Sequence, residues 1–297
     1  MFTGLSAFPL TPMDEQDIDE TAFAGLVERL AAAGVDSIGA LGSTGSYAYL
    51  SRGERARVAR IAVEHAGDVP VMIGIGALRT RDVLLLAEDA QKAGASAVLL
   101  APVSYQKLAP EEVYAHYEAV ARSLSVPMCV YDNPGTANFQ FSDELHGRIA
   151  QLPNIGSIKI PGVPSDAAEA TARVQRLRAL IPAHVTIGVS GDWFGATGMN
   201  AGCEAWYSVI GGLFPKTALA IARAAQRGDA AQATRLSARL QPYWDLIACH
   251  GGSLRVTAAA ASLLSLARSP CLPLPLKAID GADRAYLARL IEELELA

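Results

Sequence analysis

Short apolar runs alternate with longer segments of helical periodicity along residues 1–227. The apolar runs are bounded by turn-forming residues, which is typical of buried strands. The segments between them carry apolar residues at spacings of three and four, the period of an amphipathic helix. This pattern predicts eight strands, at residues 5–8, 37–41, 70–75, 97–100, 127–131, 155–160, 186–190 and 205–208.

The intervening helices are predicted at residues 19–33, 54–65, 80–93, 110–123 and 166–180. Several of them carry start or stop signals. Thr80 stands at the N-cap position of one helix, and Gly34 and Gly94 follow the ends of two others. The segment before Cys203 is short and rich in glycine, so the seventh helix of the series is expected to be truncated.

This succession of strands and helices predicts the fold class α/β, as a (β/α)8 TIM barrel. A doubly wound sheet is the alternative, although it usually has fewer strands and a switch point. From Gly228 the alternation stops, and helices are predicted at residues 230–249, 253–267 and 283–295, with CLPLPLKAID as an extended linker. We therefore expect a barrel over residues 1–227 and a helical C-terminal extension over residues 228–297.

Composition excludes several classes of partner. The net charge of −5 and the pI near 5.6 provide no basic surface for nucleic acid. No apolar run approaches the roughly 18 residues of a membrane span, and the N-terminus lacks the cationic start of a secretory signal. Four cysteines without a C-x-x-C pair are typical of reduced thiols, so a cytoplasmic location is expected. The five histidines show no metal-ligand spacing, and Gly74-x-Gly76 lacks the third glycine of a dinucleotide fingerprint.

A lysine interrupts the predicted strand at residues 155–160, in the stretch NIGSIKIPG. With a side-chain period of two, Lys159 and Ser157 point to one face of the sheet, and Ile158 and Ile160 to the other. A buried cation is costly unless it is paired or loses its charge. The chain has only five lysines among its 25 basic residues, which weakens the case for an incidental surface charge.

Other polar residues are predicted at the same edge of the barrel, because the carboxyl ends of all eight strands meet there. Tyr131 ends the fifth strand, the loop GSTGS (residues 42–46) follows the second, Ser190-Gly191-Asp192 follows the seventh, and Ile210-Gly211-Gly212 follows the eighth. A lysine, a tyrosine and hydroxyl-bearing residues are thus expected at one rim.

These residue types suit imine chemistry. Desolvation lowers the pKa of a lysine and yields an amine that attacks a ketone to form a Schiff base. The alternative is a lysine that reaches from a strand end to water. Tyr131 is either a proton relay or a rim tyrosine with a satisfied hydroxyl. Ser43 and Thr44 offer hydroxyls and backbone N–H groups as a carboxylate cradle, or form an ordinary Gly/Ser loop.

The ordered set of Phe2-Thr3-Gly4, Gly-Ser-Thr-Gly, Tyr131, Ile-Lys and Ser-Gly-Asp resembles the dihydrodipicolinate synthase / N-acetylneuraminate lyase family of class I Schiff-base aldolases. The resemblance covers nearly the whole chain. It implies that Lys159 forms the Schiff base, that Tyr131 transfers protons, and that the Thr44 hydroxyl links this tyrosine to the substrate. It also implies a homotetramer built as a dimer of dimers, and no metal or organic cofactor, because the imine itself is the electron sink.

The same resemblance assigns the residues that bind substrate. Ser43 and Thr44 correspond to the pair that holds the carboxylate of the 2-oxo acid. Tyr105 is the candidate for a tyrosine that reaches into the site of a neighbouring subunit. Ile210, at the end of the last strand, is placed among the substrate-binding residues.

The departures from the family pattern concern the second substrate. Ser46, the last residue of the GSTGS loop, stands where the family usually has a glutamate. Ile160 and Pro161 follow the lysine where the family often has Glu-Ala or Glu-Ser. Residues 134–138 contain no arginine, whereas the synthases bind the second substrate's carboxylate with one. Arg52, Arg55 and Leu78 do not match the lysine-inhibition site of bacterial synthases. The residues expected to bind pyruvate therefore match the family pattern, whereas those expected to bind the second substrate depart from it.

These observations favour a carbon–carbon or carbon–oxygen lyase that joins pyruvate or a related 2-oxo acid to an aldehyde, cleaves such a product, or dehydrates a 2-oxo sugar acid. One alternative is 4-hydroxy-tetrahydrodipicolinate synthase proper. Another is a barrel that binds keto acids without turnover, and a weaker one is a phosphate-binding barrel that uses Gly211-Gly212. In each case the partners are small molecules.

Overall fold

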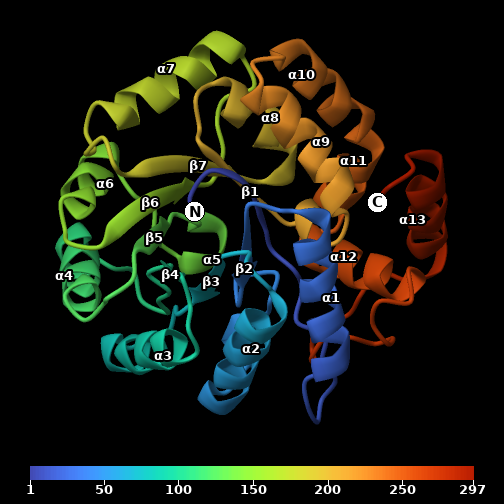
Figure 1. Cartoon of the computed structure of the whole chain (residues 1–297), viewed down its shortest axis with the longest axis horizontal. Helices are drawn as coiled ribbons and strands as arrows, with labels where there is room; N and C mark the ends of the chain where they lie inside the picture. Colours follow the sequence, from blue (N-terminus) through green and yellow to red (C-terminus); the bar gives the residue numbers. More distant parts are fainter.

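Eight parallel strands close into a barrel in chain order in the computed structural model, which describes residues 1–297 (Figure 1). The first strand pairs with the last, so the sheet has no edge and the doubly wound alternative is wrong. The predicted strands are confirmed to within a residue at either end. They are β1 (Gly4–Ala7), β2 (Ser37–Ala40), β3 (Val71–Gly74), β4 (Ala97–Leu100), β5 (Met128–Tyr131), β6 (Ile155–Ile160), β7 (Thr186–Ser190) and β8 (Ala205–Ser208).

Helices surround the barrel in the ring seen in Figure 1. They are α1 (Glu20–Ala33), α2 (Arg52–His65), α3 (Thr80–Lys92), α4 (Pro110–Ala121), α6 (Asp143–Ala150), α7 (Ala167–Arg178), α8 (Gly195–Asn200) and α9 (Pro215–Gln226). A further short helix, α5 (Pro134–Ala137), lies in the loop after β5. The six residues of α8 confirm the predicted truncation.

Local sequence signals explain several helix boundaries. The Asp19 carboxylate accepts the N–H of Ala22 at the start of α1, and Gly34 ends that helix with φ of 75°. Ser51 and Glu54 form a capping box at the start of α2. The Thr80 cap is wrong. Arg79 occupies the N-cap, and Thr80 is the first helical residue; its hydroxyl pairs with Nδ1 of His116 at 2.9 Å and caps no backbone N–H of the helix.

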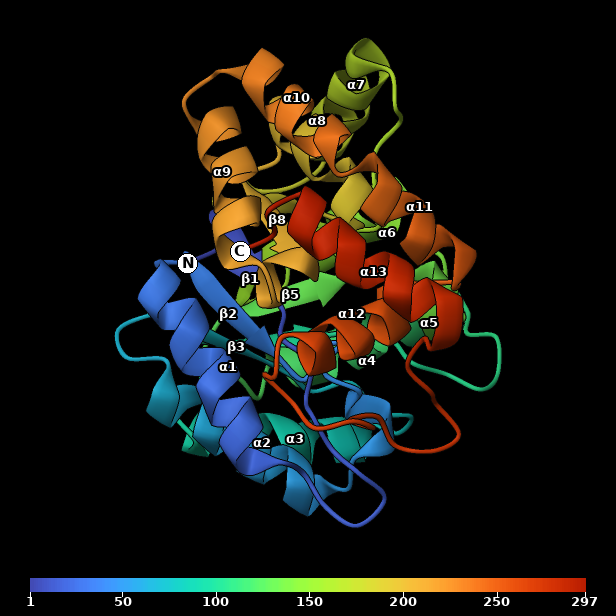
Figure 2. The same cartoon turned by 90° about the vertical axis from the view of Figure 1, so that its right-hand side faces the viewer.

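Four helices follow the barrel, namely α10 (Ala230–Arg239), α11 (Gln241–Cys249), α12 (Ser253–Leu263) and α13 (Gly281–Glu293). The single helix predicted at residues 230–249 is wrong, since the helix is interrupted at Leu240 and forms α10 and α11 instead. Pro242 explains the break, because proline is tolerated in the first turn of a helix but disrupts a helix interior. Figure 2 shows α13 lying across α11 and α12, and the three helices pack on one another. No helix is both long and apolar enough to span a membrane.

Side chains of the strands alternate between two hydrophobic layers. Ile158 and Ile160 belong to the large layer between sheet and helices. A separate cluster fills the barrel interior and consists of Phe8, Met72, Ala97, Leu99, Ala101, Cys129, Tyr131, Ala137, Ala205 and Tyr207. Because Lys159 is the register partner of Tyr131, its side chain belongs to the interior face, as the period of two predicts.

Candidate active site

Lys159 lies inside the carboxyl end of the barrel and is almost fully buried, with 4% of its surface exposed. Its Nζ is 4.0 Å from the ring centroid of Phe8 and 4.1 Å from that of Tyr131. No carboxylate lies within ion-pair distance of this amine. Burial therefore lowers the pKa of Lys159 to about 8, while the charges of Cys129 and Asp192 act in the opposite direction.

Tyr131 shares the end of the barrel with this amine, because β5 and β6 pair with Tyr131 opposite Lys159. The tyrosine hydroxyl lies 3.3 Å from Oγ of Ser43 and accepts Nδ2–H of Asn133 at 2.9 Å. Burial raises the pKa of Tyr131, and the two hydrogen bonds oppose that rise only in part. The phenol is consequently protonated at neutral pH and available as a proton donor.

Ser43 and Thr44 both lie in the loop that follows β2, but only Ser43 is within hydrogen-bond distance of the Tyr131 hydroxyl. Thr44 is 5% exposed, and its hydroxyl makes no hydrogen bond within the chain. The loop is tight, with positive φ at Leu41 (58°) and Ser46 (52°). In this geometry Ser43 takes the place beside Tyr131 that the family resemblance assigns to Thr44.

Tyr105 and Ile210 lie apart from the amine in different ways. Tyr105 is 86% exposed in the loop between β4 and α4, and its only hydrogen bond is from Asn138 to its backbone carbonyl at 3.4 Å. Ile210 is buried. Its N–H donates to Oδ2 of Asp192 at 2.7 Å, and its carbonyl accepts the N–H of Phe214 at 2.7 Å. The structure thus brings together Lys159, Tyr131 and Ser43, and does not bring Tyr105 to the amine of its own chain.

Asn133 is a site residue that the sequence analysis missed. Its Nδ2 lies within hydrogen-bond distance of three hydroxyls, those of Tyr131 (2.9 Å), Ser43 (3.3 Å) and Thr136 (2.5 Å). It lies two residues beyond the end of β5, which is a signal that could have singled it out. Asn133 thus orients the hydroxyls of β5 and of the β2 loop toward one another.

Asp192 is the second missed residue, although the Ser-Gly-Asp motif contains it. The carboxylate is buried and accepts three hydrogen bonds, from Oγ of Ser208 (2.9 Å), N of Val209 (3.1 Å) and N of Ile210 (2.7 Å). Burial raises the pKa of Asp192, and these bonds together with the charge of Lys159 act against the rise. Asp192 therefore ties the 3-10 helix Asp192–Phe194 to the end of β8.

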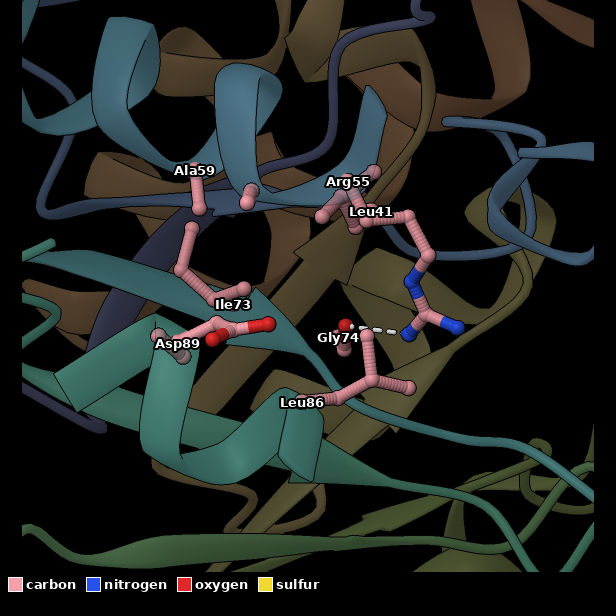
Figure 3. Close-up of a pocket in the computed structure, with 9 residues that line it drawn as sticks. Leu41, Arg55, Ala59, Ile73, Gly74, Leu86 and Asp89 are labelled. Atoms are coloured by element: carbon pink, nitrogen blue, oxygen red, sulfur yellow. Dashed lines mark hydrogen bonds between the residues drawn. The ribbon is translucent and has the colours of Figure 1, made fainter. Parts of the chain in front are cut away.

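Arg55 is a buried arginine that stabilises the barrel and does not contact Lys159. Arg55 of α2 donates to the carbonyls of Gly74 (2.8 Å) and Gly76 (2.9 Å) at the end of β3, beside the small cavity drawn in Figure 3. Its guanidinium also lies over the ring of Tyr47, 5.2 Å from the centroid. Burial lowers the pKa of Arg55 to about 10. Arg55 thus fixes strand ends rather than presenting its charge beside Lys159.

These features define a class of protein, a (β/α)8 barrel with a buried, unpaired lysine at the carboxyl end of its sixth strand. Comparison with known proteins narrows this class. The model of the dihydrodipicolinate synthetase family matches residues 1–294, so the chain belongs to that family. Membership of this family places the protein among the class I aldolases and assigns it a general lyase activity.

Two relatives illustrate the similarity. The 4-hydroxy-tetrahydrodipicolinate synthase of Bartonella quintana (strain Toulouse) is 32% identical over 292 residues, which cover 95% of this chain and 97% of the relative. A crystal structure described as dihydrodipicolinate synthase from Agrobacterium tumefaciens superposes with a TM-score of 0.94 at 47% identity, covering 99% and 98% of the two chains.

Another similar structure was solved with pyruvate bound. The dihydrodipicolinate synthase of Acinetobacter baumannii, solved in complex with pyruvate, has a TM-score of 0.89 at 26% identity and covers the whole of both chains.

Proposed function

We propose that this protein is a lyase that forms a Schiff base between Lys159 and a 2-oxo acid such as pyruvate. The observation that carries the proposal is the buried Lys159 amine, which faces aromatic rings and no carboxylate. With a pKa of about 8, roughly one molecule in ten holds the neutral amine at pH 7. An ordinary lysine would offer roughly one in three thousand.

The proposed reaction begins with attack of the Lys159 amine on the keto carbon. Tyr131 gives its proton to the departing oxygen, and water leaves as the C=N bond forms. Loss of a proton from the adjacent carbon gives an enamine, which adds to the carbonyl of an aldehyde. In the reverse direction, the same imine accepts the electron pair of the breaking carbon–carbon bond. Ser43 and Asn133 orient the Tyr131 hydroxyl through the hydrogen bonds described above.

Ser43, Thr44 and Ile210 form the proposed 2-oxo acid subsite. The unpartnered Thr44 hydroxyl and the tight backbone of the β2 loop suit a carboxylate, which hydroxyl and N–H donors bind well. The relative from Acinetobacter baumannii, complexed with pyruvate, supports a small 2-oxo acid as the ligand.

The second substrate is proposed to be a hydroxylated aldehyde, or a 2-oxo sugar acid that is dehydrated. The loop after β5 offers Asn133 and Thr136 near Tyr131, and residues 132–140 contain no lysine or arginine. A second carboxylate would lose a charged hydrogen bond of roughly 1.5–3 kcal/mol at this place. Hydroxyl groups would instead pair with the neutral donors and acceptors of the loop.

The relatives named 4-hydroxy-tetrahydrodipicolinate synthase support a second candidate, the synthase reaction itself. The two candidates differ in their second substrate. We expect turnover of pyruvate with aspartate semialdehyde to be at least tenfold below that with the best hydroxyaldehyde, and Thr136→Arg to raise it. Equal turnover with both aldehydes would refute our preference and favour the synthase.

Borohydride trapping tests the chemistry common to both candidates. The protein is incubated with pyruvate and reduced, its intact mass is measured, and the modified peptide is mapped. We expect an adduct on Lys159 that is lost in Lys159→Met and kept in Lys107→Met, a matched control at an exposed lysine. Retention of keto-acid binding without any adduct would instead identify a non-catalytic keto-acid-binding barrel.

The assembly is proposed to be a homotetramer, a dimer of dimers, in which the exposed Tyr105 meets a neighbouring subunit. Analytical ultracentrifugation measures the assembly, and Tyr105→Ala is expected to reduce turnover if the side chain enters the partner's site. We further propose that residues 228–297 are an appendage of the barrel and not an independent domain, since α10 packs on α8 and α9. By similarity to bacterial relatives, a cytoplasmic location is proposed.

A further inference from the structure

A second buried polar cluster lies on the outer side of β5, directly behind Tyr131. Asp132 follows Tyr131 in the chain, so its side chain points away from the barrel interior. The carboxylate is 5% exposed, and its Oδ2 lies 3.5 Å from Nε2 of His146 on α6, which is 1% exposed. This distance exceeds that of a good hydrogen bond, so the two groups face each other without forming a well-made hydrogen bond.

Neighbouring elements enclose this pair on all sides. The ring of Phe141 stacks on His146 with centroids 4.7 Å apart and an interplanar angle of 7°. Three other titratable or charged groups face the pair, namely Tyr117 of α4, Asp143 of α6 and Arg173 of α7. Arg173 pairs with Asp143 at 2.8 Å, and the Tyr117 hydroxyl donates to the carbonyl of Leu100 at 2.6 Å.

The cluster has spare hydrogen-bonding capacity. Oδ1 of Asp132, both ring nitrogens of His146 and Nη1 of Arg173 are buried without a hydrogen-bond partner. Buried polar atoms are nearly always paired in folded proteins, so four unpaired atoms in one place are unusual. Such a cluster has two arrangements available. A protonated Asp132 can donate to His146, whereas an ionised Asp132 is attracted by the charge of Arg173.

Burial favours the neutral form of each partner. It raises the pKa of Asp132 to about 7, with Arg173 opposing and Asp143 adding to the rise. Burial and the charge of Arg173 lower the pKa of His146 to about 3. The pair therefore holds its proton on Asp132 in mildly acidic solution and loses it near neutrality.

Asp132 is joined to the reacting groups through the backbone. Its N–H donates to the carbonyl of Lys159 at 3.0 Å, which extends the pairing of β5 with β6. Its neighbour Asn133 donates to the Tyr131 hydroxyl at 2.9 Å. A shift of the Asp132 side chain from His146 toward Arg173 would therefore act on the short segment that carries Tyr131 and Asn133.

We propose that Asp132 and His146 form a buried proton-sharing pair that positions the Tyr131 hydroxyl, and that loss of its proton displaces this hydroxyl from the reacting position. Both are positioning residues, since neither touches the amine. The proposal rests on the proposed function for its activity readout, but it also predicts a spectroscopic change that needs no turnover.

The activity test compares Asp132→Asn with the wild type from pH 6 to pH 8.5. Asparagine retains the uncharged form and cannot ionise. The rate of imine formation with pyruvate rises with pH in both proteins as Lys159 loses its proton. The ratio of variant to wild-type rate cancels that rise and is expected to increase about tenfold across this range, the size of a sub-ångström misplacement. A constant ratio would overturn the proposal.

Two further variants separate positioning from general damage. In His146→Gln the amide can accept from protonated Asp132 or donate to the ionised form, so this variant should lack the relative decline in rate that the wild type shows above pH 7. His184→Gln changes an exposed histidine in the loop between α7 and β7, outside the cluster, and should leave the pH profile unchanged. An equal effect of both histidine variants would overturn the proposal.

Nuclear magnetic resonance follows the same event without a substrate. With tyrosine labelled at Cζ, the Tyr131 signal is expected to shift in two steps, one with a midpoint near pH 7 from Asp132 and one near pH 8 from Lys159. The step near pH 7 should vanish in Asp132→Asn, and the step near pH 8 should remain. Persistence of the step near pH 7 in that variant, or its absence in the wild type, would overturn the proposal. A wild-type protein that shows the step near pH 7 but forms no borohydride adduct would refute the proposed function and leave the pair intact.

Discussion

Lys159→Met removes the buried charge while it keeps a side chain of similar length and shape. The pKa of this lysine falls from 10.5 to about 8 on folding, a difference of about 2.5, and each pKa unit corresponds to about 1.36 kcal/mol. Keeping the ammonium form at pH 7 thus costs the folded protein about 3 kcal/mol. The variant also loses the ring contacts to Phe8 and Tyr131, which attract the cation by roughly 1 kcal/mol. We therefore expect the free energy of unfolding to rise by about 2 kcal/mol at pH 7.

The sign of the pH dependence follows from proton counts. Between about pH 8 and pH 10.5, the unfolded chain keeps a proton on this lysine and the folded chain does not. The unfolded state then binds more protons, so the stability contributed by Lys159 rises with pH through this window. The advantage of Lys159→Met should be constant below about pH 8 and should disappear as the pH approaches 10.5.

Urea unfolding followed by circular dichroism measures this difference at pH 7, 8.5 and 9.5. Lys107→Met is the matched control, because Lys107 is exposed and its replacement should leave the free energy of unfolding nearly unchanged. If Lys159→Met were no more stable than the wild type at pH 7, or if its advantage did not depend on pH, the amine would not be desolvated as argued here.

Three further predictions concern single side chains. Tyr131→Phe should slow adduct formation with pyruvate in the trapping assay by about 10²–10⁴-fold, the usual worth of a positioned proton donor, and an unchanged rate would exclude this role. Asp192→Asn should cost about 1–3 kcal/mol in urea unfolding, because one amide oxygen replaces two acceptor oxygens, and should move the midpoint of the trapping rate to lower pH. Gly74→Ala should cost more than about 3 kcal/mol, since its Cβ would lie 1.9 Å from the carbonyl oxygen of Leu41, whereas Gly53→Ala meets nothing within 4 Å and should be neutral or stabilising.

Periodicity was sufficient to place Lys159. A period of two in residues 155–160 sets which side chains face the barrel interior, and the closure of a parallel sheet brings strand ends together. The pairing of Tyr131 with Lys159 follows from these two rules. They act over a whole strand, so a single wrong boundary residue does not change the result.

Loop geometry was not predictable in the same way. Whether Ser43 or Thr44 meets Tyr131 depends on the left-handed backbone at Leu41 and Ser46, which no residue pattern in GSTGS specifies. The inward turn of Asn133 depends on the short helix α5, which begins at Pro134. Both residues lie in loops, where the position of one side chain depends on contacts distant in the sequence.

The choice of neighbours around the amine decides what the site can do. A carboxylate at ion-pair distance from Lys159 would hold its pKa at or above the usual value and keep the amine protonated at neutral pH. Asp192 is the buried carboxylate near this lysine, and its oxygens already accept the N–H groups of Val209 and Ile210 and the hydroxyl of Ser208. The faces next to the amine are instead the rings of Phe8 and Tyr131, which exclude water and bind a cation far more weakly than water does. The same arrangement that lowers the stability of the fold therefore provides the neutral amine on which the proposed imine formation depends.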